Sequence, residues 1–268
     1  MNRVISFASG KGGVGKTSLV VNLGSLLARR GVKTLLIDGD WSLGKLSLML
    51  GVKPTWTVEK VLSGEIGMQN AIQAVSENLS LLASPSGLLG FEEMTEATRN
   101  QLFFELEGLQ NQFDLILLDH SSGIHWGVVQ FAAACHHHVI VTTPEPTSYT
   151  DAYAIMKILS KRFSIRDFSL VVTMSHNTKE TDQIIKRFMD LTRSQLDVRV
   201  SLMGVFPWEP RVNESICRQK PFVELFPNQD FSLRLEQLSE KLEAMEVNPT
   251  HGLQFFMERG YDNSAKEI

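Results

Sequence analysis

The sequence predicts an α/β fold: a doubly wound, mostly parallel seven-stranded sheet with helices on both faces. Short and nearly continuous apolar runs alternate along the chain with longer segments of helical period, which is typical of strands buried between two layers of helices. A glycine-rich loop joins the first apolar run to the first helical segment, as in folds that bind phosphate. At 268 residues, 43% of them hydrophobic, the chain can bury one substantial core.

Seven apolar runs are the expected strands. In chain order they are Val4–Phe7, Thr34–Ile37, Leu79–Leu82, Leu115–Leu118, Val139–Thr142, Leu170–Thr173 and Leu202–Phe206. Helical spacing predicts helices at Thr17–Arg30, Glu92–Gln110, Ser148–Phe163, Lys179–Gln195 and Phe231–Met245. The pair Asn248-Pro249 breaks the last helix. We therefore expect one domain over residues 1–246 and a tail over residues 247–268.

Composition argues against several classes of protein. A net charge of −4 gives no global attraction to nucleic acid or to anionic lipid. Cys135 and Cys217 are too few and too far apart for a disulfide framework, which favours a cytoplasmic location. No apolar run approaches the roughly 20 residues of a membrane span. The run His136-His137-His138 is a poor metal site, because consecutive residues entering a strand face alternate sides.

The loop after the first predicted strand reads Gly10-Lys11-Gly12-Gly13-Val14-Gly15-Lys16-Thr17. Its glycines permit the backbone conformations that wrap phosphate oxygens with N–H groups, and the helix that follows adds its positive dipole end. Lys16 is expected to reach the β- and γ-phosphates, and the Thr17 hydroxyl to bind Mg²⁺. The predicted nucleotide contacts here are Gly10, Lys11, Gly12, Gly13, Val14, Gly15, Lys16, Thr17 and Ser18, with ATP and Mg²⁺ as cofactors.

Carboxylates follow two of the predicted strands. Asp38 and Asp40 lie two residues apart after Thr34–Ile37, so both side chains can face the Mg²⁺ end of the loop. Taken alone, such a pair could also be an ordinary turn at a strand end. Asp119 follows the strand Leu115–Leu118, where a terminal carboxylate typically holds a Mg²⁺-bound water.

Lys11, a second lysine in the loop directly after Gly10, marks a resemblance to the deviant Walker A class of the MinD/ParA/nitrogenase-iron-protein superfamily. The resemblance covers roughly Arg3 to Gln237. It implies a slow, Mg²⁺-dependent ATPase that forms a homodimer around ATP. It also implies that Lys11 crosses the dimer interface and stabilises transition-state charge in trans. Asp38 would contact a Mg²⁺-bound water, and Asp40 would position or deprotonate the attacking water, so the implied catalytic residues are Lys11, Lys16 and Asp40.

The same resemblance suggests contacts to the rest of the nucleotide. The backbone N–H of Gly123 would sense the γ-phosphate. Asn177 would contact adenine, and Pro207 and Glu209 would flank the base. A loop asparagine and a turn proline are also ordinary features of loops, so a purely structural role is equally open for these residues.

The stretch Thr142–Tyr153 resembles that of the flagellar-number ATPases, the FlhG/FleN group, more than that of division-site MinD. This implies control of flagellar number or placement, with flagellar assembly or regulatory proteins as partners. Division-site MinD and a ParA-type DNA-partitioning ATPase are alternatives, although the acidic balance counts against nucleic acid. A nucleotide-binding scaffold with negligible turnover is another, because Lys45 and Ser47 stand where relatives usually place Asn and Asp.

The tail carries an apolar cluster. Leu253, Phe256 and Met257 share one helical face, as in the short amphipathic helix with which relatives grip a membrane. Only Arg259 is basic there, whereas interfacial helices favour several Lys or Arg. Peripheral attachment to the inner face of the cell membrane and docking on a protein are both open.

Overall fold

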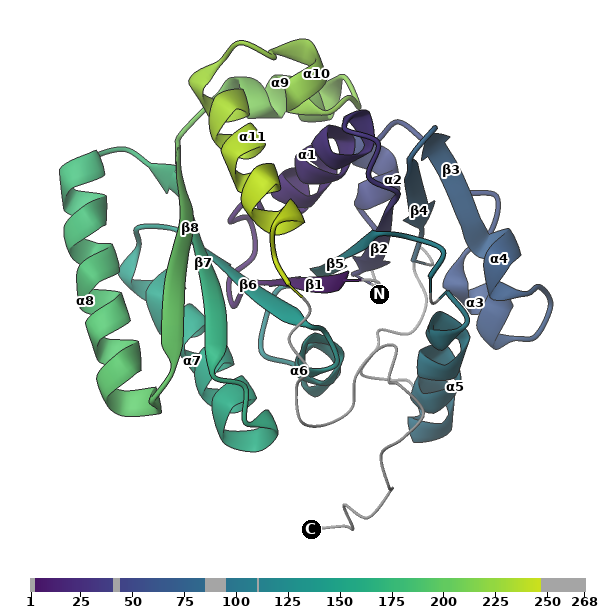
Figure 1. Cartoon of the computed structure of the whole chain (residues 1–268), viewed down its shortest axis with the longest axis horizontal. Coiled ribbons are helices and arrows are strands. Elements are labelled where there is room, and N and C mark those ends of the chain that lie inside the picture. Colours follow the sequence, from purple (N-terminus) through teal and green to yellow (C-terminus); the bar gives the residue numbers. More distant parts are fainter. Residues whose placement is uncertain (1–2, 41–43, 85–94, 110, 247–268) are drawn as a thin grey trace.

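The computed structural model describes residues 3–40, 44–84, 95–109 and 111–246. These residues form an eight-stranded sheet in the order β3-β4-β2-β5-β1-β6-β7-β8, with helices on both of its faces (Figure 1). All neighbouring strands run parallel except β3, which pairs antiparallel with β4. The predicted doubly wound, mostly parallel fold is confirmed.

The strands are β1 (Arg3–Ala8), β2 (Thr34–Gly39), β3 (Ile72–Ser76), β4 (Leu79–Leu82), β5 (Leu115–His120), β6 (His137–Thr142), β7 (Asp167–Ser175) and β8 (Arg199–Pro207). The helices are α1 (Lys16–Arg29), α2 (Leu46–Met49), α3 (Val58–Leu62), α4 (Met68–Ala71), α5 (Glu96–Glu107), α6 (Trp126–Ala133), α7 (Pro146–Phe163), α8 (Thr178–Leu196), α9 (Arg211–Cys217), α10 (Phe222–Leu225) and α11 (Asp230–Glu243).

Each of the seven predicted strands is present, but the predicted number is one too low. The additional strand is β3, at one edge of the sheet, where every side chain is partly or fully exposed. Its residues form no apolar run, so the pattern that marks buried strands is missing there. The predicted helix Glu92–Gln110 is confirmed as α5, which begins after the N-cap Thr95 and is shorter than expected.

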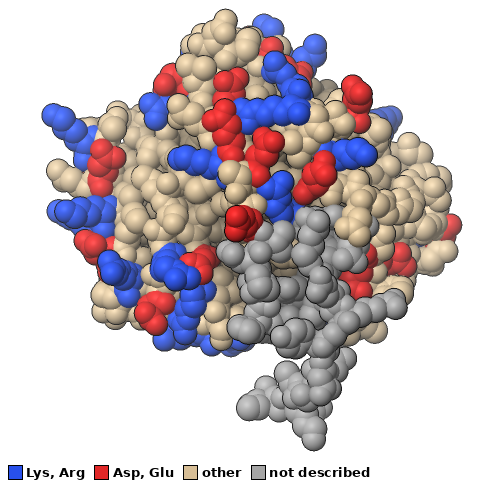
Figure 2. Space-filling model, in the orientation of Figure 1, with Lys and Arg blue, Asp and Glu red and all other residues tan. Residues whose placement is uncertain are grey.

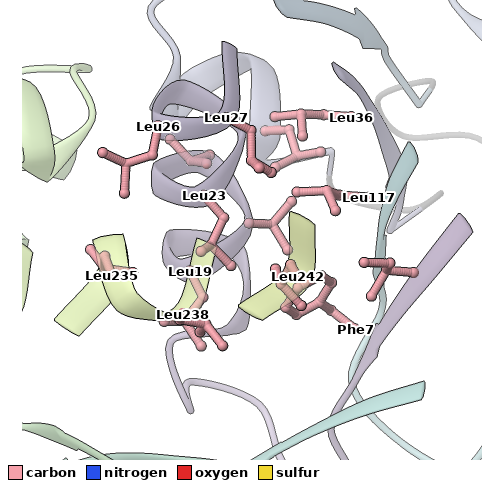
Figure 3. Close-up of a cluster of buried hydrophobic side chains, with 14 of the residues drawn as sticks. Phe7, Leu19, Leu23, Leu26, Leu27, Leu36, Leu117, Leu235, Leu238 and Leu242 are labelled. Atoms are coloured by element: carbon pink, nitrogen blue, oxygen red, sulfur yellow. The ribbon is translucent and has the colours of Figure 1, made fainter. Parts of the chain in front are cut away.

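The helix that follows the glycine-rich loop is buried between the sheet and α11. Leu19, Leu23 and Leu26 of α1 lie among leucines of β2, β5 and α11, and their side chains fill the space between these elements (Figure 3). Asn22 is also buried: it donates to the Ser18 carbonyl at 2.7 Å and accepts from the Val223 N–H at 3.0 Å. Packing and hydrogen bonds therefore fix α1, and with it the end of the loop.

The three consecutive histidines lie where β6 begins. His136 accepts the Val4 N–H at its Nδ1, 3.0 Å away, which requires an unprotonated nitrogen. His138 is buried with its ring 6.0 Å from that of Phe168, and neither of its nitrogens has a hydrogen-bond partner. Burial lowers the pKa of His138 to about 3 and that of His136 to about 4. Among the residues that the structure describes, no group of three metal-binding side chains comes together.

The predicted tail, including Leu253, Phe256 and Met257, lies outside the described residues. Within the described ranges, no helix combines the length and the apolar character that crossing a bilayer requires.

His138 predicts a pH dependence of stability. A histidine whose folded pKa lies below the unfolded value of 6.5 binds fewer protons in the folded chain, so stability is lost as the pH falls below 6.5. His138→Leu removes this penalty. Urea unfolding between about pH 7.5 and about pH 5 should therefore show a smaller loss of unfolding free energy than in the wild type. The same loss in both proteins would contradict the assignment of a neutral, buried imidazole.

Candidate nucleotide-binding site

The glycine-rich loop connects the carboxyl end of β1 to α1. Gly13 and Gly15 have φ angles of 78° and 85°, in the left-handed region that glycine adopts without strain. Gly15 is the N-cap of α1 and supplies no side-chain cap, so the first N–H groups of the helix have no capping side chain. Such an uncapped N-terminus at the end of a glycine-rich loop is a favourable place for phosphate oxygens.

A buried ion pair forms beneath this loop. The Lys16 ammonium donates to Asp119 Oδ1 at 2.5 Å and also to the carbonyl of His120. The His120 Nε2 shares a hydrogen bond of 2.9 Å with Ser6 Oγ. Burial, together with the Lys16 charge, lowers the pKa of His120 to about 3. The imidazole is therefore neutral, and the positive charge at this point belongs to Lys16.

Asp38 and Asp119 lie side by side. They are register partners in the parallel strands β2 and β5, and both side chains are almost completely buried. Asp38 accepts the N–H groups of Asp40 and Leu46 at 3.1 and 3.0 Å. Burial, reinforced by the negative charge of Asp119, raises the pKa of Asp38 to about 7. Two buried carboxylates that repel each other in this way are suited to bind a divalent cation that prefers oxygen ligands.

The remaining predicted catalytic residues form ion pairs on the outer side of the site. Asp40 binds Lys45, with 2.9 Å between Oδ2 and Nζ, and the Asp40 carbonyl accepts from Ser84 Oγ at 3.0 Å. Lys11 binds Glu145, the residue that precedes α7, and 42% of the lysine side chain is exposed. The two lysines of the loop thus point in different directions, Lys16 inward and Lys11 toward the surface.

Gly123 lies over the loop in the segment after β5. Its φ of 111° is available only to glycine without strain, and its N–H donates to the Ser9 carbonyl at 3.0 Å. A Cβ on Gly12 would be 3.3 Å from Ser122 Oγ, which shows how closely the two segments approach. Because Ser9 already accepts the Gly123 N–H, sensing of a γ-phosphate by this group would require that bond to break.

Two neighbouring cavities open beside the loop. The larger, of about 360 Å³, is lined by Gly13, Gly15 and Ser18 on one side and by Pro207, Trp208 and Glu209 on the other. The second, of about 270 Å³, contains Asn177. Met174 and Trp208 line both cavities, and the Trp208 indole stacks on His176 with 5.8 Å between ring centroids.

The structure therefore brings Pro207 and Glu209 to the phosphate loop and places Asn177 one cavity away. The Asn177 side-chain oxygen caps α8, accepting the N–H groups of Lys179 and Glu180 at 3.1 and 3.4 Å. Its amide NH₂ is the group that could donate a hydrogen bond to a nucleotide base. Glu209 pairs with Arg211 at 2.8 Å, which lowers the carboxyl pKa and keeps it ionised.

Comparison with known proteins identifies the family. The profile of the family described as AAA domain matches residues 2–165. The chain is 29% identical to the antiactivator FleN of Pseudomonas aeruginosa, over 96% of this chain and 92% of FleN. It is 30% identical to the flagellum site-determining protein YlxH of Helicobacter pylori, over 96% of this chain and 89% of YlxH. The structure of the septum site-determining protein MinD from Pyrococcus horikoshii, complexed with Mg-ADP, matches with a TM-score of 0.72 and 24% identity, over 91% of this chain and 97% of that one.

The chain belongs to the MinD/ParA family of P-loop ATPases. It is an ATPase with ATP and Mg²⁺ as cofactors. In this family context, the buried carboxylate pair beside the P-loop is suited to Mg²⁺, and the larger cavity borders the loop at Gly13 and Gly15.

Sequence reasoning missed two residues that line both cavities of this ATPase. Trp208 stands between Pro207 and Glu209, so its position alone could have drawn attention to it. Met174 has a φ of 56°, which is uncommon for a residue other than glycine, and nothing in the sequence signals it. It follows Thr173, whose hydroxyl donates to the Val14 carbonyl at 2.7 Å and so ties β7 to the P-loop.

Lys16→Ala tests the phosphate site. The substitution removes a charged hydrogen-bond donor, so binding of a fluorescent ATP analogue should weaken by roughly tenfold or more. Lys33→Ala, at an exposed lysine where β2 begins, is the matched control and should bind as the wild type does. Because Lys16→Ala also leaves Asp119 without its partner, circular dichroism must show that the variant is folded. Unchanged binding by folded Lys16→Ala would refute the assignment.

Proposed function

We propose that this chain is an ATP-driven switch that dimerises around its nucleotides and controls the number or placement of flagella. The observation that carries the proposal is the opposite orientation of the two P-loop lysines. Lys16 is buried against Asp119, whereas Lys11 lies at the surface and contacts only an exposed carboxylate, Glu145, among the interactions described. A lysine placed in this way can reach a nucleotide held by a second copy of the chain.

The chain's own groups account for binding and orientation in this proposal. Thr17, Asp38 and Asp119 would hold Mg²⁺, and the loop residues Gly10 to Ser18 would surround the phosphates. Lys16 would exchange its bond to Asp119 for a bond to a phosphate oxygen. The Asp119 carboxylate would then be free to contact Mg²⁺. Bound Mg²⁺ supplies charge neutralisation at the phosphates.

Asp40 and Lys11 would complete the site in the dimer. Asp40 would orient the attacking water. Lys11 would break its ion pair with Glu145 and then stabilise transition-state charge across the interface. Gly123 would meet the γ-phosphate after releasing Ser9, while Asn177, Pro207 and Glu209 would surround the base together with Trp208. Slow hydrolysis would then return the dimer to monomers.

The flagellar role is supported by the two relatives. FleN is named an antiactivator and YlxH a flagellum site-determining protein, and this chain spans 92% and 89% of their respective lengths. A DNA-partitioning role would need a continuous basic surface. Figure 2 instead shows Lys and Arg interspersed with Asp and Glu over the described part of one face. The inner face of the cell membrane and a flagellar protein partner are both proposed targets of the dimer, since the tail pattern allows either.

The switch predicts opposite effects of two substitutions. Asp40→Ala should bind ATP and accumulate as a dimer, because the water loses its orienting group while phosphate contacts persist. Lys11→Ala should bind ATP as a monomer, because only the contact across the interface is lost. Light scattering with ATP and Mg²⁺ distinguishes them. An Asp40→Ala protein that stays monomeric, or a Lys11→Ala protein that dimerises normally, would refute this division of roles.

The flagellar role predicts a cellular phenotype. Cells that lack the protein, and cells that carry Asp40→Ala, should differ from wild type in the number or position of flagella, because the switch can no longer cycle. Electron microscopy of negatively stained cells gives the counts, and a fluorescent fusion gives the protein's position. The exposed-site variant Lys33→Ala is the control. Normal flagella in both mutant strains, with ATPase activity intact in the purified wild type, would reject the flagellar role while leaving the switch in place.

A further inference from the structure

The backbone around Lys45 is pressed against the buried carboxylates. The Leu46 N–H donates to Asp38 Oδ2 at 3.0 Å, and the Leu46 side chain is fully buried. A Cβ on Gly44 would overlap Ser84 Oγ and lie 3.2 Å from Asp38 Oδ2, so only glycine fits there without a shift. Lys45, the N-cap of α2, stands between these two anchored residues and is therefore held beside the site.

The Lys45 ammonium faces the acidic cluster. Its Nζ lies 2.9 Å from Asp40 Oδ2, and the Asp40 side chain is only 14% exposed although half of the lysine side chain meets solvent. Its pKa is raised by the hydrogen bond to Asp40 and by the charges of Asp40, Asp119 and Asp38, despite partial burial. One lysine charge thus acts on all three carboxylates that we assign to the metal and to the attacking water.

We propose that Lys45 is a positioning residue that restrains hydrolysis: it holds Asp40 in an ion pair and competes electrostatically with Mg²⁺ at the carboxylate cluster. The inference rests on the role given to Asp40 in the proposed function. A carboxylate bound to an ammonium is a weaker base and is held away from other partners, so Lys45 must release Asp40 before the water can be oriented. The same charge repels a divalent cation at Asp38 and Asp119.

Two substitutions separate charge from packing. Lys45→Gln removes the charge and keeps a hydrogen-bonding end on a side chain one atom shorter, and Lys45→Arg keeps the charge. Lys60→Gln is the matched control, because Lys60 of α3, outside the site, also pairs with a carboxylate five residues further along the chain, Glu65 at 2.8 Å. Asp40→Ala and the double variant Asp40→Ala/Lys45→Gln show whether Lys45 acts through Asp40.

Two measurements are made on the full chain. The first is the free Mg²⁺ concentration at half-maximal binding of a fluorescent ATP analogue. Lys45→Gln should lower it by roughly three- to tenfold, also in the Asp40→Ala background, because the charge still faces Asp38 and Asp119 there. The second is ATP hydrolysis. Lys45→Gln should raise kcat by roughly the same factor with KM for ATP little changed, and this gain should vanish in the double variant. Lys45→Arg and Lys60→Gln should behave as wild type in both.

Two results would overturn the inference. If Lys45→Gln lowers kcat and Lys45→Arg keeps the wild-type value, the lysine charge assists Asp40 in hydrolysis and does not restrain it. Wild-type values of kcat and of the Mg²⁺ midpoint in Lys45→Gln would make the ion pair an ordinary surface contact. Failure of the proposed function itself is seen separately, as wild-type hydrolysis by the single variant Asp40→Ala.

Discussion

Two carboxylates buried side by side at the ends of β2 and β5 place the strongest demand on the rest of the site. Asp38 and Asp119 are register partners, so the parallel sheet fixes their separation and neither can turn away into solvent. Burial of like charges is expensive unless each charge is paired or hydrogen-bonded. Neighbouring groups compensate these charges: Lys16 pairs with Asp119, two backbone N–H groups donate to Asp38, and Lys45 adds a positive charge from the outer side.

These compensating groups stay in place because the elements that carry them are packed into the core. Lys16 begins α1, whose leucines lie between the sheet and α11, and Asn22 joins the same helix to α10. The Leu46 side chain is buried in that core as well, which holds the start of α2 over Asp38. A change in the ion pairs can therefore occur at the side chains without displacing the backbone that presents them.

The sequence alone predicted the parts of this arrangement that depend on local pattern. The strand–loop–helix context identified the P-loop, and the positions of Asp38 and Asp119 directly after two predicted strands assigned both carboxylates to the Mg²⁺ site. The edge strand β3 was not predicted, because its partly or fully exposed residues form no apolar run. The pairing of Lys45 with Asp40 depends on the start of the four-residue helix α2, whose geometry no periodicity encodes, and the periodicity that predicted α8 does not show that the Asn177 oxygen caps it. The positive φ of Met174 likewise has no signal in the sequence pattern.

Among the described residues of the site, three lysines are each bound to a carboxylate of the same chain: Lys16 to Asp119, Lys45 to Asp40 and Lys11 to Glu145. In the proposed function, triphosphate oxygens would compete with these carboxylates for the lysines, and Mg²⁺ would compete with the lysines for the carboxylates. Binding would then be an exchange of ion pairs between groups that are already oriented, which would avoid much of the cost of desolvating new charges. The three exchanges differ in burial: the Lys16 pair is enclosed, whereas the Lys11 pair is open to solvent. In the proposed switch, the enclosed pair would exchange with a nucleotide of its own chain and the open pair with a nucleotide of a second chain, which would couple ATP binding to dimer formation.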